Sequence, residues 1–371
     1  MEIKIDRDEL LGNVSRVQSI IEKKSNMPIL STVLLTAAGE EVTLSATDLE
    51  LGFRQTIGAD VISEGSVTIS GRKLFEILKE SNQGVFHIKE KENNWVFISD
   101  NIARFNLACL PADEYPSFVE PEGVAMVEFD GNIISEMINK TIYSVTMEEA
   151  GFKLSGVYTE KVSYGGKNFL RMVSTDGHRL SMIDKSVPSL DSLDLAKGVM
   201  IPKKGMSELN KLASEGGQIQ IGFKEKNCVV KKGGALLVMR LLEAKFPDYQ
   251  AVIPKEERVS IEVKRISLLE AMRKMLILSN ERYRAVKIAL ENDTMELVST
   301  NPDLGEAREN IEVVYQGERL ETGFNPRYFV DALQAMESEV VSLGFIDNSK
   351  PCILRGEADD GFLGLIMPMR V

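Results

Sequence analysis

The string Thr175-Asp176-Gly177-His178-Arg179 contains the residue types best suited to chemistry in this sequence. An aspartate and a histidine two positions apart can share proton-transfer work only if both project from one face of a straight strand. The Asp-Gly pair favours a turn instead. The sequence has only one other histidine, His87, and no Gly-x-Ser-x-Gly nucleophile motif. We therefore expect His178 to be a turn or binding-surface residue, and a catalytic His178 is the weaker alternative.

Acidic residues recur at Asp48, Asp176 and Asp303, which occupy similar places in three repeated stretches. Acids at turns most often accept backbone hydrogen bonds, so turn formation is favoured over metal binding. The glycine pairs at 165–166 and 233–234 lack the order of a phosphate-binding loop and indicate hairpin turns. The sequence thus predicts no catalytic centre, no metal site and no cofactor.

The elements that must position these residues form three similar units. Apolar strands end in Ala46-Thr47-Asp48, Ser174-Thr175-Asp176 and Ser299-Thr300-Asn301, with the threonines 128 and then 125 residues apart. Such a period indicates equivalent structural units built around an axis. Helical periodicity predicts two helices per unit, over residues 7–24, 72–80, 132–146, 202–214, 264–279 and 325–336. Apolar, strand-like runs fill the rest, so we expect an α+β chain of three domains, each with two helices packed on antiparallel sheet.

Charge is distributed unevenly between these elements. The net charge of −12 argues against a nucleic-acid partner, because phosphate binding normally requires basic residues. The six predicted helices, however, contain 16 basic and 9 acidic residues, whereas the rest of the chain contains 28 basic and 47 acidic. This contrast predicts one surface that attracts a polyanion and another that repels it.

Composition is that of an ordinary soluble protein of 371 residues, long enough for two or three domains. We see neither an export signal nor an apolar run long enough to span a membrane. Cys109, Cys228 and Cys352 occur singly in apolar runs, so we expect reduced core residues in a cytoplasmic protein. The apolar C-terminal segment 363–371 is either a plain edge strand or part of an interaction surface.

Five strings resemble those of one family. They are Ala-Thr-Asp-Leu-Glu at 46–50, Thr-Asp-Gly-His-Arg-Leu at 175–180, Phe-Pro-Asp-Tyr at 246–249, Ser-Asn-Glu at 279–281 and Met-Pro-Met-Arg at 367–370. In this order and spacing they are similar to the bacterial beta sliding clamp, the processivity subunit of DNA polymerase III. The resemblance covers the whole chain. It implies clamp domains at 1–122, 123–252 and 253–371, and two chains joined head to tail in a closed ring.

The resemblance also implies a function without catalysis. The ring would encircle double-stranded DNA without reading its sequence. It would tether the DNA polymerase III alpha subunit, the clamp loader, other polymerases and repair proteins, which bind through short linear motifs. Rival hypotheses are an enzyme centred on His178 and a β-rich scaffold that binds only proteins.

Site residues follow from the resemblance, position by position. The partner-peptide pocket would comprise Leu154, Thr175, Gly177, His178, Arg179, Leu180, Pro247, Val252, Leu365, Met367, Pro368 and Met369. DNA contacts would be made by Lys23, Lys24, Arg72, Lys203, Lys204, Arg273 and Arg327. The dimer interface would join Arg104, Phe105 and Leu107 to Ile277, Leu278, Asp303 and Glu306 of the other chain. Lys153, Ala251 and Pro351 depart from residues found in some family members, so the preferred peptide motif stays open.

Overall fold

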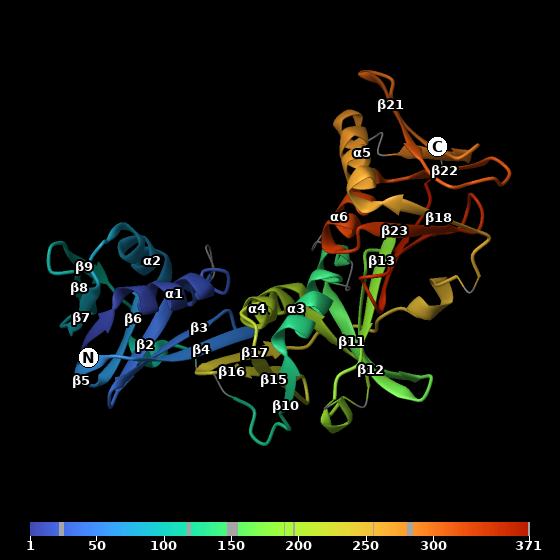
Figure 1. Cartoon of the computed structure of the whole chain (residues 1–371). Coiled ribbons are helices and arrows are strands. Elements are labelled where there is room, and N and C mark those ends of the chain that lie inside the picture. Colours follow the sequence, from blue (N-terminus) through green and yellow to red (C-terminus); the bar gives the residue numbers. More distant parts are fainter. Residues whose placement is uncertain are drawn as a thin grey trace. The chain divides into compact units, whose positions relative to one another are not determined.

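The computed structural model describes residues 1–21, 26–116, 120–146, 155–188, 190–195, 197–254, 256–279 and 285–369. The chain forms two compact units (Figure 1). One unit comprises Met1–Gly131, Ser192–Asp194 and Lys211–Leu241, and the other comprises Asn132–Asp191, Leu195–Asn210 and Leu242–Val371. The middle sequence repeat is therefore divided between the two units.

The first unit contains two antiparallel sheets. The larger has the strand order β10-β15-β16-β17-β4-β3-β2-β6, and the smaller has the order β5-β1-β7-β8-β9. The strands of the larger sheet are β2 (Thr32–Ala38), β3 (Glu41–Thr47), β4 (Leu51–Gly58), β6 (Gly65–Ser70), β10 (Val127–Asp130), β15 (Gln218–Lys224), β16 (Asn227–Lys232) and β17 (Ala235–Arg240). Those of the smaller sheet are β1 (Glu2–Asp6), β5 (Asp60–Ser63), β7 (Val85–Lys91), β8 (Trp95–Ser99) and β9 (Arg104–Ala108).

The second unit repeats this plan. Its larger sheet has the order β14-β11-β12-β13-β25-β24-β23-β18 and its smaller one the order β21-β20-β19-β22. The strands of the larger sheet are β11 (Gly156–Tyr164), β12 (Lys167–Thr175), β13 (Arg179–Lys185), β14 (Val199–Pro202), β18 (Val259–Lys264), β23 (Val340–Phe345), β24 (Cys352–Gly356) and β25 (Phe362–Ile366). Those of the smaller sheet are β19 (Val286–Glu291), β20 (Thr294–Asn301), β21 (Gly305–Glu312) and β22 (Leu320–Phe324).

The α-helices found in the described residues begin at the expected places. They are α1 (Arg7–Val17), α2 (Gly71–Glu80), α3 (Gly131–Asn139), α4 (Lys203–Ala213), α5 (Arg265–Leu278) and α6 (Pro326–Ala335). Side-chain caps account for several starts. The carboxylate of Asp6 accepts bonds from the amides of Asp8 and Glu9, and the Asn325 side chain accepts one from Arg327 ahead of Pro326. None of these helices is long and apolar enough to cross a membrane.

Two helices are shorter than predicted. The helix expected over 7–24 ends at Val17, where a tight turn follows: the Ile20 and Ile21 amides both donate to the Val17 carbonyl. The helix expected over 132–146 ends at Asn139, and the Thr141 hydroxyl donates back to the Met137 carbonyl. Such back-bonding competes with helix continuation. With the observed bounds, the helices contain 12 basic and 8 acidic residues against 32 and 48 elsewhere, so the charge contrast keeps its sign but is smaller.

Strand pairing joins the sequence repeats to one another. In the first unit β4 pairs with β17, from Leu51↔Met239 to Gln55↔Ala235. In the second unit β13 pairs with β25, from Arg179↔Ile366 to Ile183↔Phe362. Each seam between repeats is thus the middle of a continuous sheet. β25 is also paired with β24, so the C-terminal segment is an internal strand and the edge-strand alternative is wrong.

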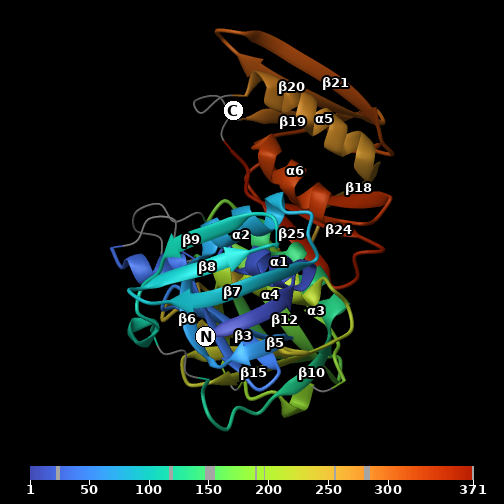
Figure 2. The same ribbon diagram turned by 90° about the vertical axis from the view of Figure 1, so that its left-hand side faces the viewer.

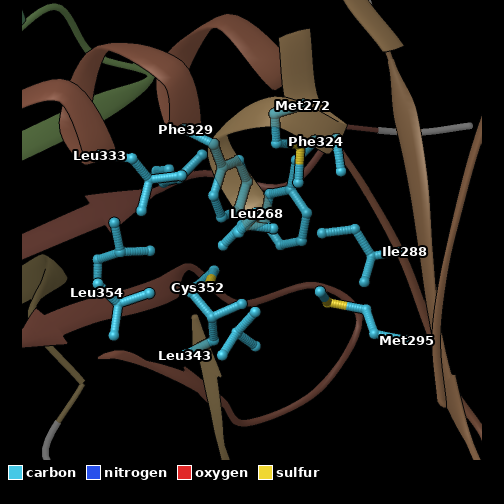
Figure 3. Close-up of a cluster of buried hydrophobic side chains, with 14 of the residues drawn as sticks. Leu268, Met272, Ile288, Met295, Phe324, Phe329, Leu333, Leu343, Cys352 and Leu354 are labelled. Atoms are coloured by element: carbon cyan, nitrogen blue, oxygen red, sulfur yellow. The ribbon is translucent and has the colours of Figure 1, made fainter. Parts of the chain in front are cut away.

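The core of the second unit lies between its helices and its two sheets (Figure 3). Phe324 and Phe329 meet edge to face there, with ring centroids 5.5 Å apart. Cys352 lies in this core, and Cys228 is buried in the first unit. Burial raises the pKa of both thiols, which keeps them protonated. Cys109 is only half-buried, so the prediction of a core residue is not met at that position.

Candidate functional site

The turn that connects β12 to β13 is built by its own polar side chains. The Thr175 hydroxyl donates to the Arg179 carbonyl at 2.6 Å and accepts from the Gly177 amide at 3.1 Å. Asp176 accepts from the amides of His178 and Arg179, both at 3.0 Å. Gly177 has φ +85°, which a residue without Cβ adopts at little cost. The polar residues of this string therefore stabilise the turn, and the His178 side chain on it is exposed.

The same turn occurs in the first repeat. Thr47 bonds to the Leu51 carbonyl and the Leu49 amide, and Asp48 accepts from the amides of Glu50 and Leu51. These bonds confirm Asp48 and Asp176 as turn formers. In the third repeat the acceptor is the side chain of Asn301, which takes a bond from the Asp303 amide. Asp303 is therefore not the equivalent of the other two aspartates: Asn301 follows Thr300 as Asp48 follows Thr47, and Asp303 lies two residues further along the turn.

Arg179 connects this turn to other elements of the second unit. Its guanidinium lies 3.0 Å from Asp176, 2.6 Å from Asp331 on α6 and 2.7 Å from the Tyr143 carbonyl. The same group lies 4.7 Å from the ring centroid of Tyr328. The Arg179 side chain is only 12% exposed, so its main role in the fold is to hold the turn against α6 and the Tyr143 backbone.

The C-terminal segment lies beside the turn. β25 pairs with β13, and beyond it the Met367 amide donates to the His178 carbonyl at 2.9 Å. The Met369 amide then donates to the Gly323 carbonyl. Met367 and Pro368 are half-buried and Met369 is 38% exposed. The segment therefore runs beside the turn that carries His178. The exposed His178 ring stacks on Tyr328 with centroids 6.4 Å apart.

An apolar cluster forms the floor beneath this surface. Leu180 and Leu365 are 4% and 2% exposed and pack with Phe246 and Tyr249 of the proline-rich linker. Phe246 stacks on Tyr158 with centroids 4.8 Å apart. Of the remaining predicted pocket residues, Pro247 is exposed and Val252 is 46% exposed, while Thr175 is buried in the turn. The described members thus gather around one seam, and Leu154 lies outside the described residues.

Tyr249 fixes the linker to this seam. Its hydroxyl donates to Glu160 at 2.5 Å and accepts from Arg171 at 3.0 Å. Burial, together with the carboxylate of Glu160, raises the pKa of Tyr249 above its ordinary value. Arg171 also forms a bidentate pair with Asp184, with both N–O distances at 2.6 Å. Sequence reasoning missed this network, although the Phe-Pro-Asp-Tyr string marked one end of it.

The predicted DNA-facing cations within the described ranges all lie on helices. Arg72 is the second residue of α2, Lys203 and Lys204 begin α4, Arg273 is on α5 and Arg327 is the second residue of α6. Arg72, Lys204, Arg273 and Arg327 are exposed. Lys203 is half-buried, and burial together with nearby Arg179 lowers the pKa of its ammonium group. Lys23 and Lys24 lie outside the described residues.

One helical lysine counted as basic surface is instead buried. Lys140 is 1% exposed and lies 2.7 Å from Glu136 and 2.8 Å from Asp359. Lys185 reaches the same oxygen of Glu136 at 2.9 Å. This network joins the end of α3 to the loop before β25, so Lys140 is a structural residue.

Each of the two smaller sheets ends in a strand that has no strand partner on its outer side among the described residues. β9 is last in its sheet and β21 is first in its own. Arg104 on β9 is exposed, and Phe105 and Leu107 are half-buried. On the other side Asp303 and Glu306 are exposed near β21, Ile277 at the end of α5 is 75% exposed and Leu278 is half-buried. Within the described residues no group of three histidine, cysteine, aspartate or glutamate side chains could hold a metal ion.

Comparisons with known proteins agree with this geometry. Models of the DNA polymerase III beta subunit match in order: the N-terminal domain over residues 1–119, the central domain over 128–248 and the C-terminal domain over 250–370. Beta sliding clamps from Pseudomonas putida and Caulobacter vibrioides are 32% and 30% identical over 374 residues, covering 100% of both chains in each comparison. A crystal structure of the Bartonella birtlesii sliding clamp bound to griselimycin has a TM-score of 0.94 at 30% identity, with complete coverage of both chains.

Fold, repeats and seam thus define a DNA sliding clamp, a class of protein that acts in DNA replication. More narrowly, the chain belongs to the DNA polymerase III beta subunit family. This family is a non-catalytic processivity factor, which confirms the resemblance and removes the enzyme hypothesis for His178.

Proposed function

We propose that two copies of this chain join head to tail into a closed ring that encircles double-stranded DNA. Each chain contributes clamp domains at 1–122, 123–252 and 253–371. The observation that carries the proposal is the match of three successive clamp-domain models to the three sequence repeats. A heterologous contact between identical chains closes into a ring when its rotation is a simple fraction of a turn.

The ring would hold DNA by charge without reading bases. The helices carry a positive excess and the strands and loops a negative one. Contacts with phosphate position a protein on duplex DNA without specifying sequence, so the ring can slide. We assign this role to Lys23, Lys24, Arg72, Lys203, Lys204, Arg273 and Arg327.

The dimer interface would form between the edge strands β9 and β21 of different copies. Each strand has main-chain groups without a strand partner on its outer side among the described residues. Arg104 would face the acidic Asp303 and Glu306, and Phe105 and Leu107 would meet Ile277 and Leu278. Edge pairing plus apolar contact satisfies the hydrogen bonds that an exposed edge leaves open.

Partners would dock at the seam around His178 and Met367. The flexible methionines and the apolar floor suit short peptides of varied sequence. We assign the pocket to Leu154, Thr175, Gly177, His178, Arg179, Leu180, Pro247, Val252, Leu365, Met367, Pro368 and Met369. Its ligands would be short linear motifs of the DNA polymerase III alpha subunit, the clamp loader, other polymerases and repair proteins. The protein would bind them in the cytoplasm. Tethering raises the effective concentration of a polymerase at its primer end.

A topological experiment tests encirclement. The protein is loaded onto nicked circular plasmid by a clamp loader with ATP, and retention is measured by gel filtration before and after linearisation. A ring stays on the circle and slides off the ends, so linearisation should release it. Equal retention on both forms would overturn the proposal and favour a scaffold that binds only proteins.

A further inference from the structure

Strand β18 in the second unit has one free edge. It is last in its sheet and pairs with β23 alone among the described residues. The Arg265 amide, next along the chain, donates to the Glu339 carbonyl at 2.9 Å. Main-chain groups alternate between the two sides of a strand, so the amides and carbonyls of Glu262 and Lys264 point away from β23. Another strand could form hydrogen bonds with them.

The equivalent edge in the first unit is occupied. β1 opens the first repeat as β18 opens the third, and each leads directly into a helix. The first residue of that helix, Arg7 or Arg265, donates its amide to the carbonyl just before β7 or β23. On its other side β1 pairs with β5, and Lys4 lies opposite Asp60. The fold therefore already accepts a short strand at this edge, with opposite charges across from each other.

The segment that corresponds to β5 takes another course in the second unit. The Val313 amide donates to the Asp293 carbonyl at 3.0 Å, and the Asp293 amide donates to the Tyr315 carbonyl at 2.9 Å. The chain after β21 thus follows the β19–β20 turn and not β18. Helix α5 packs against β18, β20 and β21 (Figure 2). A cleft of about 1060 Å³ remains between β18, the start of α5, the β19–β20 turn and the end of β21.

This cleft is acidic. The charged side chains that line it are Glu262, Glu270, Asp293, Glu309 and Glu312 against Lys264. Glu309 is paired with Lys274 at 2.7 Å, and the Asp293 carboxylate accepts a bond from the Tyr315 amide at 2.8 Å. Glu262, Glu270 and Glu312 are exposed, and no lysine or arginine in the described ranges forms an ion pair with them. Negative charge therefore prevails in the cleft after its ion pairs are counted.

We propose that the free edge of β18 binds an extended basic segment of a partner protein as an added strand. Glu262 lies three residues before the helix start, as Lys4 does in the first unit. The charge at this position is reversed, so the residue opposite it should be a cation in place of Asp60. An added strand gains affinity from main-chain hydrogen bonds and specificity from alternate side chains. Val314 and Val340 also line the cleft, 87% and 44% exposed, and offer apolar contacts to such a segment.

Other occupants fit this edge less well. Residues 313–316 of the chain itself contain no lysine or arginine, and their main chain is already bonded to Asp293. Antiparallel pairing with β18 of a second copy about Glu262 would bring two carboxylates opposite each other. The cleft is also distinct from the peptide seam at His178. Glu306 of the proposed dimer interface lies near the opposite end of β21 from Glu312.

A model peptide tests the proposal on the full chain. The probe carries fluorescein and about six residues, the usual length of a strand, with lysine and valine alternating. Fluorescence polarisation should show saturable binding that weakens as salt is added, because salt screens charge pairs. The same peptide with glutamate in place of lysine should not bind. Methylation of the amide nitrogens keeps the charge but removes the main-chain donors, so it should lower the affinity at least about tenfold.

Variants and amide exchange locate the site. Glu262→Lys should weaken binding at least about tenfold, since like charges would then face each other. Glu357→Lys makes the same change in the exposed loop before β25 and should not alter the affinity. The peptide should slow deuterium exchange in the segment that contains β18, because an added strand protects the amides of Glu262 and Lys264. Thermal unfolding of both variants shows whether they fold.

Several results would overturn the proposal. They are absence of saturable binding at low salt, equal binding of the glutamate peptide, equal affinity in Glu262→Lys, and unchanged exchange in β18. Displacement of the probe by a clamp-binding peptide of the polymerase alpha subunit would place it at the His178 seam instead. Self-association beyond a dimer that Glu262→Lys abolishes would assign the edge to a second copy of the chain.

Discussion

Arg179 and Asp331 form an ion pair, with 2.6 Å between guanidinium and carboxylate, that ties the β12–β13 turn to helix α6. On the turn side Arg179 also bonds to Asp176 at 3.0 Å. On the helix side its guanidinium lies over Tyr328, the neighbour of Arg327. The turn proposed to bind partner peptides is therefore fastened directly to a helix proposed to face DNA.

This pair should be important for stability, because both side chains are mostly buried. Arg179→Ala should lower the free energy of unfolding by about 3 kcal/mol or more, since it leaves Asp331 partly buried without its cation. Arg179→Lys should recover only part of the loss, because one ammonium nitrogen cannot replace the three separate guanidinium nitrogens that each contact a different acceptor. Urea unfolding monitored by circular dichroism measures both changes. A loss below about 1 kcal/mol in Arg179→Ala would show that the pair is dispensable.

His178 should matter for binding and not for folding. Its ring is exposed beside Met367 and stacks on Tyr328, while the turn is held by Thr175 and Asp176. His178→Ala should therefore lower the affinity for a labelled clamp-binding peptide of the polymerase alpha subunit at least about tenfold, equivalent to about 1.4 kcal/mol of binding free energy. Fluorescence polarisation measures this affinity. The unfolding midpoint should not move.

The first repeat supplies a control for this variant. Glu50 occupies the position in the Thr47–Leu51 turn that His178 occupies in its own turn. Glu50→Ala should leave peptide affinity unchanged. Unchanged affinity in His178→Ala would remove this residue from the proposed pocket.

Acid should destabilise the protein in part through Asp359. Burial alone would raise the pKa of this carboxyl, but bonds from Lys140 and Ser338 outweigh burial and hold it below 3.8. A folded-state pKa below the unfolded one adds stability that is present above the unfolded pKa and lost as pH falls through the folded one. The free energy of unfolding should therefore drop as pH falls below about 3.8, measured by urea denaturation at successive pH values.

Asp359→Asn isolates this contribution. It should cost about 3–5 kcal/mol at neutral pH, because Lys140 remains buried with less compensation. It should also flatten the acid limb of the stability curve. If the free energy of unfolding falls as steeply with acid in Asp359→Asn as in the parent, other carboxylates cause the acid destabilisation.

The sequence predicted local features well because local interactions determine them. Caps and proline set helix starts such as those of α1 and α6, and Asp-Gly marked the turn at His178. The alternation of Ile3 and Ile5 with Lys4 is a local signal of the same kind, and the structure buries the two isoleucines and exposes the lysine. These signals lie within a few residues, so a single sequence contains them. The helix ends were less accurate, since the bonds of Thr141 and the Val17 carbonyl compete with helical bonds of similar strength.

Long-range features could not be predicted from patterns alone. Lys140 looked like an exposed helix lysine because its partner Asp359 lies in another repeat. The pairing of β4 with β17 joins residues that no local signal relates. The apolar tail suited both an edge strand and an interaction surface. It forms an internal strand up to Ile366 and an exposed segment at Met369 because β24 pairs with β25 only over 352–354.

Ring closure should depend on Arg104. Its exposed guanidinium is on the free edge strand β9, and exposed carboxylates at Asp303 and Glu306 are near the free edge strand β21. Arg104→Glu would place like charges together across the proposed interface, which costs several kcal/mol when partners approach closely. We expect the parent chain to sediment as a dimer at micromolar concentration and Arg104→Glu to shift toward the monomer mass.

Charge and position can be separated in this experiment. Lys167→Glu makes the same charge change on exposed β12 and should keep the dimer. If the interface is the proposed one, Glu306→Arg should weaken the dimer on its own, and combining it with Arg104→Glu should restore association by exchanging the two charges. Restoration would show that these two residues face each other across chains. A parent chain that remains monomeric at micromolar concentration, or an Arg104→Glu variant that dimerises like the parent, would contradict the proposed closure through β9 and β21.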